Sequence, residues 1–251
     1  MVRAALDHLV VAAATLEQGE DYVESRIGVR PQRGGKHVAM GTHNSVLRIG
    51  QGVYLEVIAI DPEAIAPEHP RWFELDRDVM QATLRVSPRL IHWVARCTDI
   101  DAVRRASAVD PGPVHAMSRG ALLESPSNVD GPVSAAAATR NSPSIPTLRA
   151  GPLAGLSRDY FHWRITIPDD GHLPGAGVLP TLIEWADADH PADAMPDAGV
   201  RLIALAAAHP EPAAMRAALG ALGLGDTLQI TFAAAPRLAA MLRTPRGPVT
   251  L

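Results

Sequence analysis

Four short stretches of the 251-residue chain share one pattern, an apolar strand-like run interrupted by a single ionisable side chain. The interrupting residues, in chain order, are His8, Glu56, His92 and Glu184. Because strand side chains alternate between two faces, each of these residues should share its face with apolar neighbours. A carboxylate in such surroundings is costly unless a partner compensates its charge. The order His, Glu, His, Glu therefore indicates two related units whose ionisable groups share one partner, and a metal ion would use all four.

Residues 1–62 are predicted to form a β-α-β-β-β module. A strand at residues 4–12 leads into a helix at roughly 16–27, for which Thr15 is a cap and Gly28 a stop signal. Three strands follow, and a glycine-containing hairpin turn joins the last two. This order of elements predicts an α+β fold.

The rest of the chain is predicted to repeat this order with variations. Residues 63–88 form a proline-containing connector, and residues 89–191 form a second β-α-β-β-β module. A Ser/Pro/Gly/Ala-rich insertion at residues 119–158 interrupts this module, and we expect it to be either mobile or a functional lid. Residues 198–251 are predicted to form a third, similar unit without a His and Glu pair, so we expect its role to be structural.

Four segments of the chain resemble the vicinal oxygen chelate superfamily, and more closely its glyoxalase-like branch. They are Leu-Asp-His-Leu-Val-Val at 6–11, Gly-Thr-His-Asn at 41–44, Tyr-Leu-Glu-Val-Ile-Ala at 54–59 and Leu-Pro-Thr-Leu-Ile-Glu-Trp at 179–185. The resemblance implies cupped mixed sheets flanked by helices, in which paired β-α-β-β-β modules surround a divalent metal. It also implies that the metal ligands come from the first and last strands of each module. By position these ligands are His8, Glu56, His92 and Glu184.

A site with two imidazoles and two carboxylates suits Zn, Ni, Mn, Co or Fe(II). Open coordination positions would let a substrate with two adjacent oxygens chelate the metal, which would stabilise an enediolate. Glu184 is the expected catalytic base, and Glu56 is the substitute. If only His8, His92 and one Glu bind, the site favours Fe(II) and oxygen chemistry instead. The expected function is thus that of a metal-dependent lyase, isomerase or dioxygenase acting on a small oxygenated molecule.

The alternative interpretation gives each His a hydrogen-bonded place in the core and each Glu an ion pair. The chain would then be a metal-free small-molecule binding protein of the same fold. Two readings also stay open for the other polar candidates. His43 and Asn44 either contact substrate at the mouth of a cavity or stabilise a plain turn. Arg164 either binds an anionic substrate or belongs to a solvated, paired face.

The composition makes several other partners unexpected. The net charge is −4 and no basic block is present, so we expect no nucleic-acid partner. No apolar run has the length of a membrane span, so we expect no membrane partner either. Cys97 is the only cysteine, which fits a reducing compartment, and the expected location is the cytoplasm. The expected partner is a small-molecule substrate. A homodimer, in which a second copy of the chain is the partner, is also compatible with the sequence.

Overall fold

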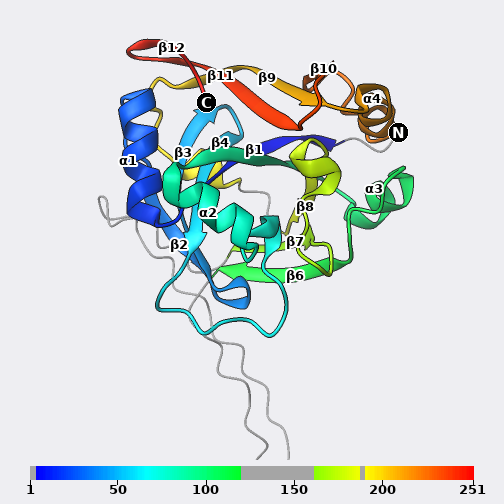
Figure 1. Cartoon of the computed structure of the whole chain (residues 1–251), viewed down its shortest axis with the longest axis horizontal. Helices are drawn as coiled ribbons and strands as arrows, with labels where there is room; N and C mark the ends of the chain where they lie inside the picture. Colours follow the sequence, from blue (N-terminus) through cyan, green and yellow to red (C-terminus); the bar gives the residue numbers. More distant parts are fainter. Residues whose placement is uncertain (1–3, 120–160, 187–189) are drawn as a thin grey trace, which may run out of the picture.

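A large mixed sheet forms the centre of the computed structural model, which describes residues 4–119, 161–186 and 190–251. Its eight strands lie in the order β2-β3-β4-β1-β5-β8-β7-β6, and a second sheet has the order β10-β9-β11-β12. Figure 1 shows the second sheet, in orange and red, lying across one side of the large sheet, with α1 in blue beside it. The predicted α+β fold of repeated β-α-β-β-β modules is confirmed.

The first module supplies half of the large sheet and one covering helix. Its elements are β1 (Ala4–Ala12), α1 (Leu16–Ile27), β2 (Gln32–His37), β3 (Thr42–Gly50) and β4 (Val53–Ile60). Helix α1 begins where the Thr15 side chain accepts a hydrogen bond from the Gln18 N–H, and it ends at Gly28 with a φ of 81°. Only glycine adopts this left-handed conformation at little cost, so both ends of the helix are set by local sequence.

The second module repeats this arrangement after a connector. The connector contains the short turn η2 (Trp72–Glu74) and the helix α2 (Asp78–Val86). The module itself contains β5 (Arg89–Cys97), α3 (Ile100–Ala106), β6 (Val114–Arg119), β7 (Phe161–Thr166) and β8 (Thr181–Trp185). The predicted insertion at 119–158, apart from its first residue, lies outside the described residues.

The two modules join through their first strands. In each module the first strand runs parallel to the last, β1 beside β4 and β5 beside β8. The two first strands pair antiparallel at the centre of the sheet, with His8 opposite Val94 and Val10 opposite His92. This pairing relates His8 to His92 by an approximate twofold rotation. Corresponding positions of the two modules can therefore be read from the register alone.

A bulge in β1 changes the face on which its side chains lie. Leu6 and His8 are two residues apart, but they pair with the adjacent residues Ala95 and Val94, so Asp7 is the extra residue. Such a bulge shifts the alternation of side chains by one place. As a result Leu6 packs in the core on the outer face of the sheet, while Val10 packs in the core on the inner face.

The C-terminal unit closes the outer core. It contains β9 (Arg201–His209), α4 (Pro212–Ala221), β10 (Gln229–Phe232), β11 (Arg237–Thr244) and β12 (Gly247–Thr250). Apolar residues of this unit, including Leu205 and Leu242, belong to the same buried cluster as Leu55 and Trp93 of the large sheet. This leaves the inner, concave face of the large sheet for a site.

None of the described helices is long and apolar enough to cross a membrane.

Replacing Leu55 by Ala should destabilise the fold substantially. Its side chain is fully buried in the outer core, and removing it leaves a cavity that costs about 2–5 kcal/mol of unfolding free energy. Urea denaturation followed by circular dichroism measures this loss. The matched control is Ile65→Ala, at a position that is 90% exposed, for which we expect a change within about 0.5 kcal/mol. Equal losses in the two variants would contradict the described core.

Candidate functional site

A pocket on the inner face of the large sheet contains a cluster of polar side chains surrounded by apolar ones. The polar lining residues are His8, His37, Asn44 and Glu56. The aromatic lining residues are Tyr54, Trp72, Phe73, Trp163 and Trp185, and the remaining described ones are Val46, Ile165, Ile183, Pro191 and Met195. The pocket measures about 60 Å³, which is space for a small ligand rather than for a large molecule.

His8 and Glu56 meet in this pocket because β1 and β4 are neighbours. The register places His8 opposite Tyr54 and Val10 opposite Glu56, so the two ionisable groups lie on the same face, one step apart. The His8 ring stacks on Tyr54 with centroids 4.5 Å apart. Its Nε2 atom lies 3.6 Å from Glu56 Oε2, and both residues are only 5% exposed. The structure thus brings together the predicted pair of the first module.

Asn44 fixes the orientation of the Glu56 carboxyl group. Its side-chain Nδ2 donates a 2.6 Å hydrogen bond to Glu56 Oε1. Its Oδ1 accepts a 2.8 Å hydrogen bond from the Gly35 N–H, which determines which end of the amide faces the carboxylate. A side chain at Gly34 would not fit here, since a Cβ atom would lie 2.0 Å from Asn44 Oδ1. The second carboxylate oxygen, Oε2, remains directed toward His8.

His37 also lines the pocket, although no role for it was predicted from the sequence. Its Nδ1 lies 3.1 Å from Thr42 Oγ1, and its Nε2 lies 3.4 Å from Asn44 Nδ2 and 3.9 Å from Glu56 Oε1. Its ring packs edge-on against Trp72 with centroids 5.0 Å apart. A second imidazole therefore lies beside the carboxylate, on the Oε1 side rather than the Oε2 side. Its position just before the Gly-Thr-His-Asn segment is the only sequence signal for it.

Asp7 hydrogen-bonds Nδ1 of His8, the ring nitrogen that does not face Glu56. Its Oδ1 accepts a 2.6 Å hydrogen bond from His8 Nδ1, and its Oδ2 accepts bonds of 2.8 Å from His190 Nε2 and 2.9 Å from Trp185 Nε1. His190 Nδ1 accepts a hydrogen bond from the Ala192 N–H, so its proton is on Nε2 and points at Asp7. With Nδ1 of His8 engaged, its Nε2 is the atom presented to Glu56.

The Asp7 carboxyl group is ionised although it is completely buried. Burial opposes its ionisation, but the hydrogen bonds that it accepts from His190 and His8 outweigh it and hold the pKa of Asp7 well below its usual range. Simple alternation would have placed Asp7 on the opposite face from His8. The bulge in β1 brings it to the same side, which is why the sequence did not assign it.

His92 is a structural residue in the second module rather than a pocket residue. It is completely buried, its Nδ1 bonds the Gly177 carbonyl at 3.3 Å, and its Nε2 accepts the Thr181 N–H at 3.1 Å. Both ring nitrogens are thus engaged with the protein itself. Burial lowers the pKa of His92 to about 3, so the ring stays neutral.

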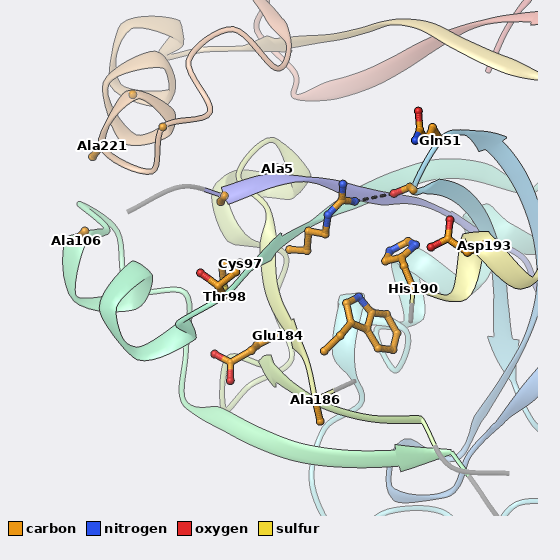
Figure 2. A pocket seen from close by; sticks show the side chains of 16 residues that line it. Ala5, Gln51, Cys97, Thr98, Ala106, Glu184, Ala186, His190, Asp193 and Ala221 are labelled. Atoms are coloured by element: carbon orange, nitrogen blue, oxygen red, sulfur yellow. Dashed lines mark hydrogen bonds between the residues drawn. The ribbon is translucent and has the colours of Figure 1, made fainter. Parts of the chain in front are cut away.

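Glu184 lies on the other face of the sheet from the pocket. Its Oε2 accepts a 2.6 Å hydrogen bond from the Ile100 N–H at the start of α3, and Arg164 lies 3.4 Å from its Oε1. Arg164 also bonds Asp101 at 2.6 Å, so it belongs to a paired surface and not to the pocket. Figure 2 shows Glu184 in a second, open depression, next to Cys97 and Thr98 and away from His190.

The strand register explains the position of Glu184. In the first module Val10 is opposite Glu56, and in the second the corresponding residue Val94 is opposite Thr181. Thr181 therefore occupies the place equivalent to Glu56, and it hydrogen-bonds His92. Ile183, not Glu184, faces the pocket.

His43 lies on the outer face of β3, because its neighbours Thr42 and Asn44 both face inward. Its side chain does not line the pocket, and burial lowers its pKa. Of the three predicted substrate contacts, the structure therefore places Asn44 in the pocket and His43 and Arg164 outside it.

The residues present do not fit the four-ligand metal site expected from the sequence. His8 and Glu56 lie close enough to share an ion, but His92 has no free nitrogen and Glu184 lies behind the sheet. Among the described residues no group of three His, Cys, Asp or Glu side chains is arranged to hold a metal ion. This arrangement of His92 and Glu184 therefore supports no chemical step through a metal ion.

Comparison with known proteins identifies the family. A model described as a glyoxalase-like domain matches residues 6–223, most of the chain. The chain belongs to the glyoxalase-like domain family. This confirms the resemblance to the vicinal oxygen chelate superfamily. No curated protein sequence matches the chain.

Solved structures with similar folds are distant in sequence. A hypothetical protein from Staphylococcus aureus is 11% identical, with a TM-score of 0.54 over 93% of this chain and 88% of that chain. The methylmalonyl-CoA epimerase of Mycobacterium tuberculosis is 14% identical, with a TM-score of 0.36 over 75% of this chain and 91% of that chain. At 11% identity the likeness to the Staphylococcus aureus protein shows a shared fold and nothing about function.

Replacing Asp7 by Asn should lower the unfolding free energy by roughly 3–5 kcal/mol at neutral pH, the usual cost of breaking a buried charge network. The folded pKa of Asp7 lies below its ordinary value of 3.8, so its contribution is complete above that value and declines as the pH falls below it. The difference between wild type and Asp7→Asn should therefore be constant from about pH 7 to pH 5 and shrink below pH 4.

Urea titrations at a series of pH values measure this difference. The exposed carboxylate Asp169 supplies the control, and Asp169→Asn should change the unfolding free energy by less than about 0.5 kcal/mol. A difference for Asp7→Asn that grows toward low pH would mean that Asp7 is protonated in the folded protein.

Proposed function

We propose that the protein is an isomerase or lyase that moves a proton on a small carbonyl compound, with Glu56 as the base. The observation that carries this proposal is the geometry of its carboxyl group. One oxygen is bonded to Asn44 at 2.6 Å, and the other is directed into the pocket, 3.6 Å from His8 Nε2. A buried carboxylate beside an imidazole is a common arrangement for acid–base catalysis.

The proposed reaction divides the work between two side chains. Glu56 Oε2 takes a proton from the carbon next to a carbonyl group, and negative charge develops on the carbonyl oxygen. His8 Nε2 gives that oxygen a hydrogen bond or its proton, which stabilises the enol form. In an isomerase the enol oxygen then returns its proton to His8 Nε2, and Glu56 delivers its proton to the same or a neighbouring carbon. In a lyase the enol oxygen likewise returns its proton to His8 as the carbonyl re-forms, and the electron pair breaks the bond to a leaving group on the next carbon, which departs with the proton from Glu56.

The neighbouring residues support these roles through position and charge. The ionised Asp7 carboxylate stabilises His8 when it carries a positive charge, as a buried aspartate does for the histidine of a catalytic triad. Asn44 keeps Oε1 of Glu56 occupied, so that proton transfer is confined to Oε2. The apolar lining of the pocket excludes water, and this strengthens each of these interactions.

A metal-free small-molecule binding protein is the second candidate. It is favoured by the second module, whose described lining residues Trp163, Ile165, Ile183 and Trp185 give the pocket apolar walls but no ionisable group. A dioxygenase is not proposed, because the site built from His8, His92 and one Glu needs a nitrogen that His92 uses within the protein.

Replacing Glu56 by Gln should abolish proton transfer while the fold is retained. We expect wild-type protein in D₂O to catalyse deuterium incorporation next to the carbonyl of hydroxyacetone or phenylacetone, followed by proton NMR. Loss of the base should reduce this rate by about 10²–10⁴-fold. The matched control is Glu184→Gln, which makes the same change behind the sheet and should leave the rate within about twofold of wild type.

Two results would contradict the proposal. The base is misassigned if Glu56→Gln exchanges deuterium as fast as wild type, or if Glu184→Gln loses the activity. The wild-type protein could also bind the ligand but exchange deuterium no faster than Glu56→Gln. That result would favour the binding protein instead.

Dialysis against EDTA should leave the exchange rate unchanged. The expectation follows from His92 and Glu184, which are engaged elsewhere and cannot complete a four-ligand site around His8 and Glu56. The measurement is the deuterium-exchange rate before dialysis, after dialysis and after adding back Zn, Ni, Mn, Co or Fe(II) separately. An activity lost on dialysis and restored by one of these ions would show that His8 and Glu56 recruit further ligands.

A further inference from the structure

The pocket contains half of all the aromatic residues in the protein. The chain has only four Trp, three Tyr and three Phe residues. Five of these ten line this pocket, namely Tyr54, Trp72, Phe73, Trp163 and Trp185. Their rings contact one another, with centroids 5.3 Å apart for Trp72 and Phe73 and 5.6 Å apart for Trp163 and Trp185. In a chain with 4% aromatic residues, this concentration calls for a functional explanation.

The polar groups and most of the aromatic groups come from different parts of the fold. His8, His37, Asn44 and Glu56 lie on β1 to β4 of the first module. The tryptophans at 163 and 185 lie on β7 and β8, and Trp72 and Phe73 lie on the connector. A ligand in the pocket therefore meets hydrogen-bonding groups from the first module. Four of the five aromatic side chains come from the second module and the connector, and the fifth, Tyr54, stacks on His8 within the first module.

The connector holds Phe73 at the pocket at a conformational cost. Phe73 and Glu74 have φ values of 61° and 58°, a left-handed conformation that is unusual for residues with side chains. The turn is held by a 2.8 Å hydrogen bond from the Glu74 N–H to the Gly171 carbonyl. An Arg71–Asp76 ion pair of 2.6 Å closes it from the other side. Backbone strain of this kind persists where the surroundings fix it, often at ligand sites.

The charge of the pocket restricts the ligand further. Among its described lining residues there is no Arg or Lys, and the one carboxylate is Glu56. An anionic group would therefore be buried beside a carboxylate without a permanent cation to pair with it, which is unfavourable. A neutral oxygen-bearing group, in contrast, can interact with Glu56 Oε2 and His8 Nε2 together.

We propose that the substrate is a neutral aryl carbonyl compound whose single aromatic ring is enclosed by the tryptophan and phenylalanine side chains. Its carbonyl group and the adjacent carbon lie against His8 and Glu56. The assignment rests on the proposed function in taking this pocket as the substrate site, but it concerns binding and does not require the reaction. Aromatic pairs in offset or edge-to-face contact are favourable beyond the apolar area that they bury.

Isothermal titration calorimetry with three matched probes tests the substrate class on the full chain. Phenylacetone has the ring and the carbonyl, cyclohexylacetone replaces the ring by a saturated one, and phenylacetate replaces the ketone by an anion. We expect phenylacetone to bind about twofold to tenfold more tightly than cyclohexylacetone, from the aromatic contacts. We expect phenylacetate to bind more than about tenfold more weakly than phenylacetone, from the unpaired charge.

Variants locate the binding to the pocket. Trp163→Leu should remove most of the preference for phenylacetone over cyclohexylacetone, and Trp72→Leu serves the same purpose if the first variant does not fold. The control is Phe232→Leu on β10, a ring that is 73% exposed and should be dispensable for binding. Equal affinities for the two ketones, tighter binding of phenylacetate, or no binding of any probe at millimolar concentration would overturn the proposal.

Deuterium exchange in the same samples separates this inference from the proposed function. Preferential binding of phenylacetone without exchange would leave the substrate class standing and overturn the proton-transfer reaction. Exchange of hydroxyacetone by a protein with no preference between phenylacetone and cyclohexylacetone would do the reverse.

Discussion

The site depends on a single buried carboxylate, that of Asp7. Its two oxygens accept hydrogen bonds from His8 on β1, from Trp185 on β8 and from His190 beyond β8. These donors come from both modules, so the orientation of His8 in the first module is fixed in part by the second. An ionised group without solvent exposure is tolerable only while all of these donors remain in place. The carboxylate thus makes the two modules interdependent at the point where the pocket is formed.

Most of the fold could be predicted from the sequence because its signals are local. The helix expected at about 16–27 is observed as Leu16–Ile27, since the Thr15 cap and the glycine at its end act within a few residues. The strands are marked by apolar runs and by turn residues in the same local way, which was sufficient to predict the modules. The third unit was likewise predicted from alternating strand and helix patterns.

The site could be predicted only where strand pairing followed the simplest pattern. His8 and Glu56 meet because β1 and β4 pair without a shift over these positions. In the second module Glu184 is one residue removed from the inward-facing Ile183, and a change of one residue moves a strand side chain to the other face. That register is set by pairing between distant strands. Asp7 lies on the same face as His8 only because of the bulge in β1. A prediction that assumes strict alternation of side chains therefore misses it.

The two modules have similar backbones but different side chains in the pocket. One side of the pocket is therefore polar and the other side is apolar. If both modules carried a His and Glu pair into the cup, the interior would present four ionisable groups that only a cation could satisfy. Instead Thr181 stands in the place equivalent to Glu56 and holds a neutral His92 within the core. The walls of the second module can therefore be apolar, with Trp163 and Trp185 facing the pocket. In the proposed complex the first module would fix the polar end of the ligand and the second module its ring, so that the carbon next to the carbonyl group would face Glu56.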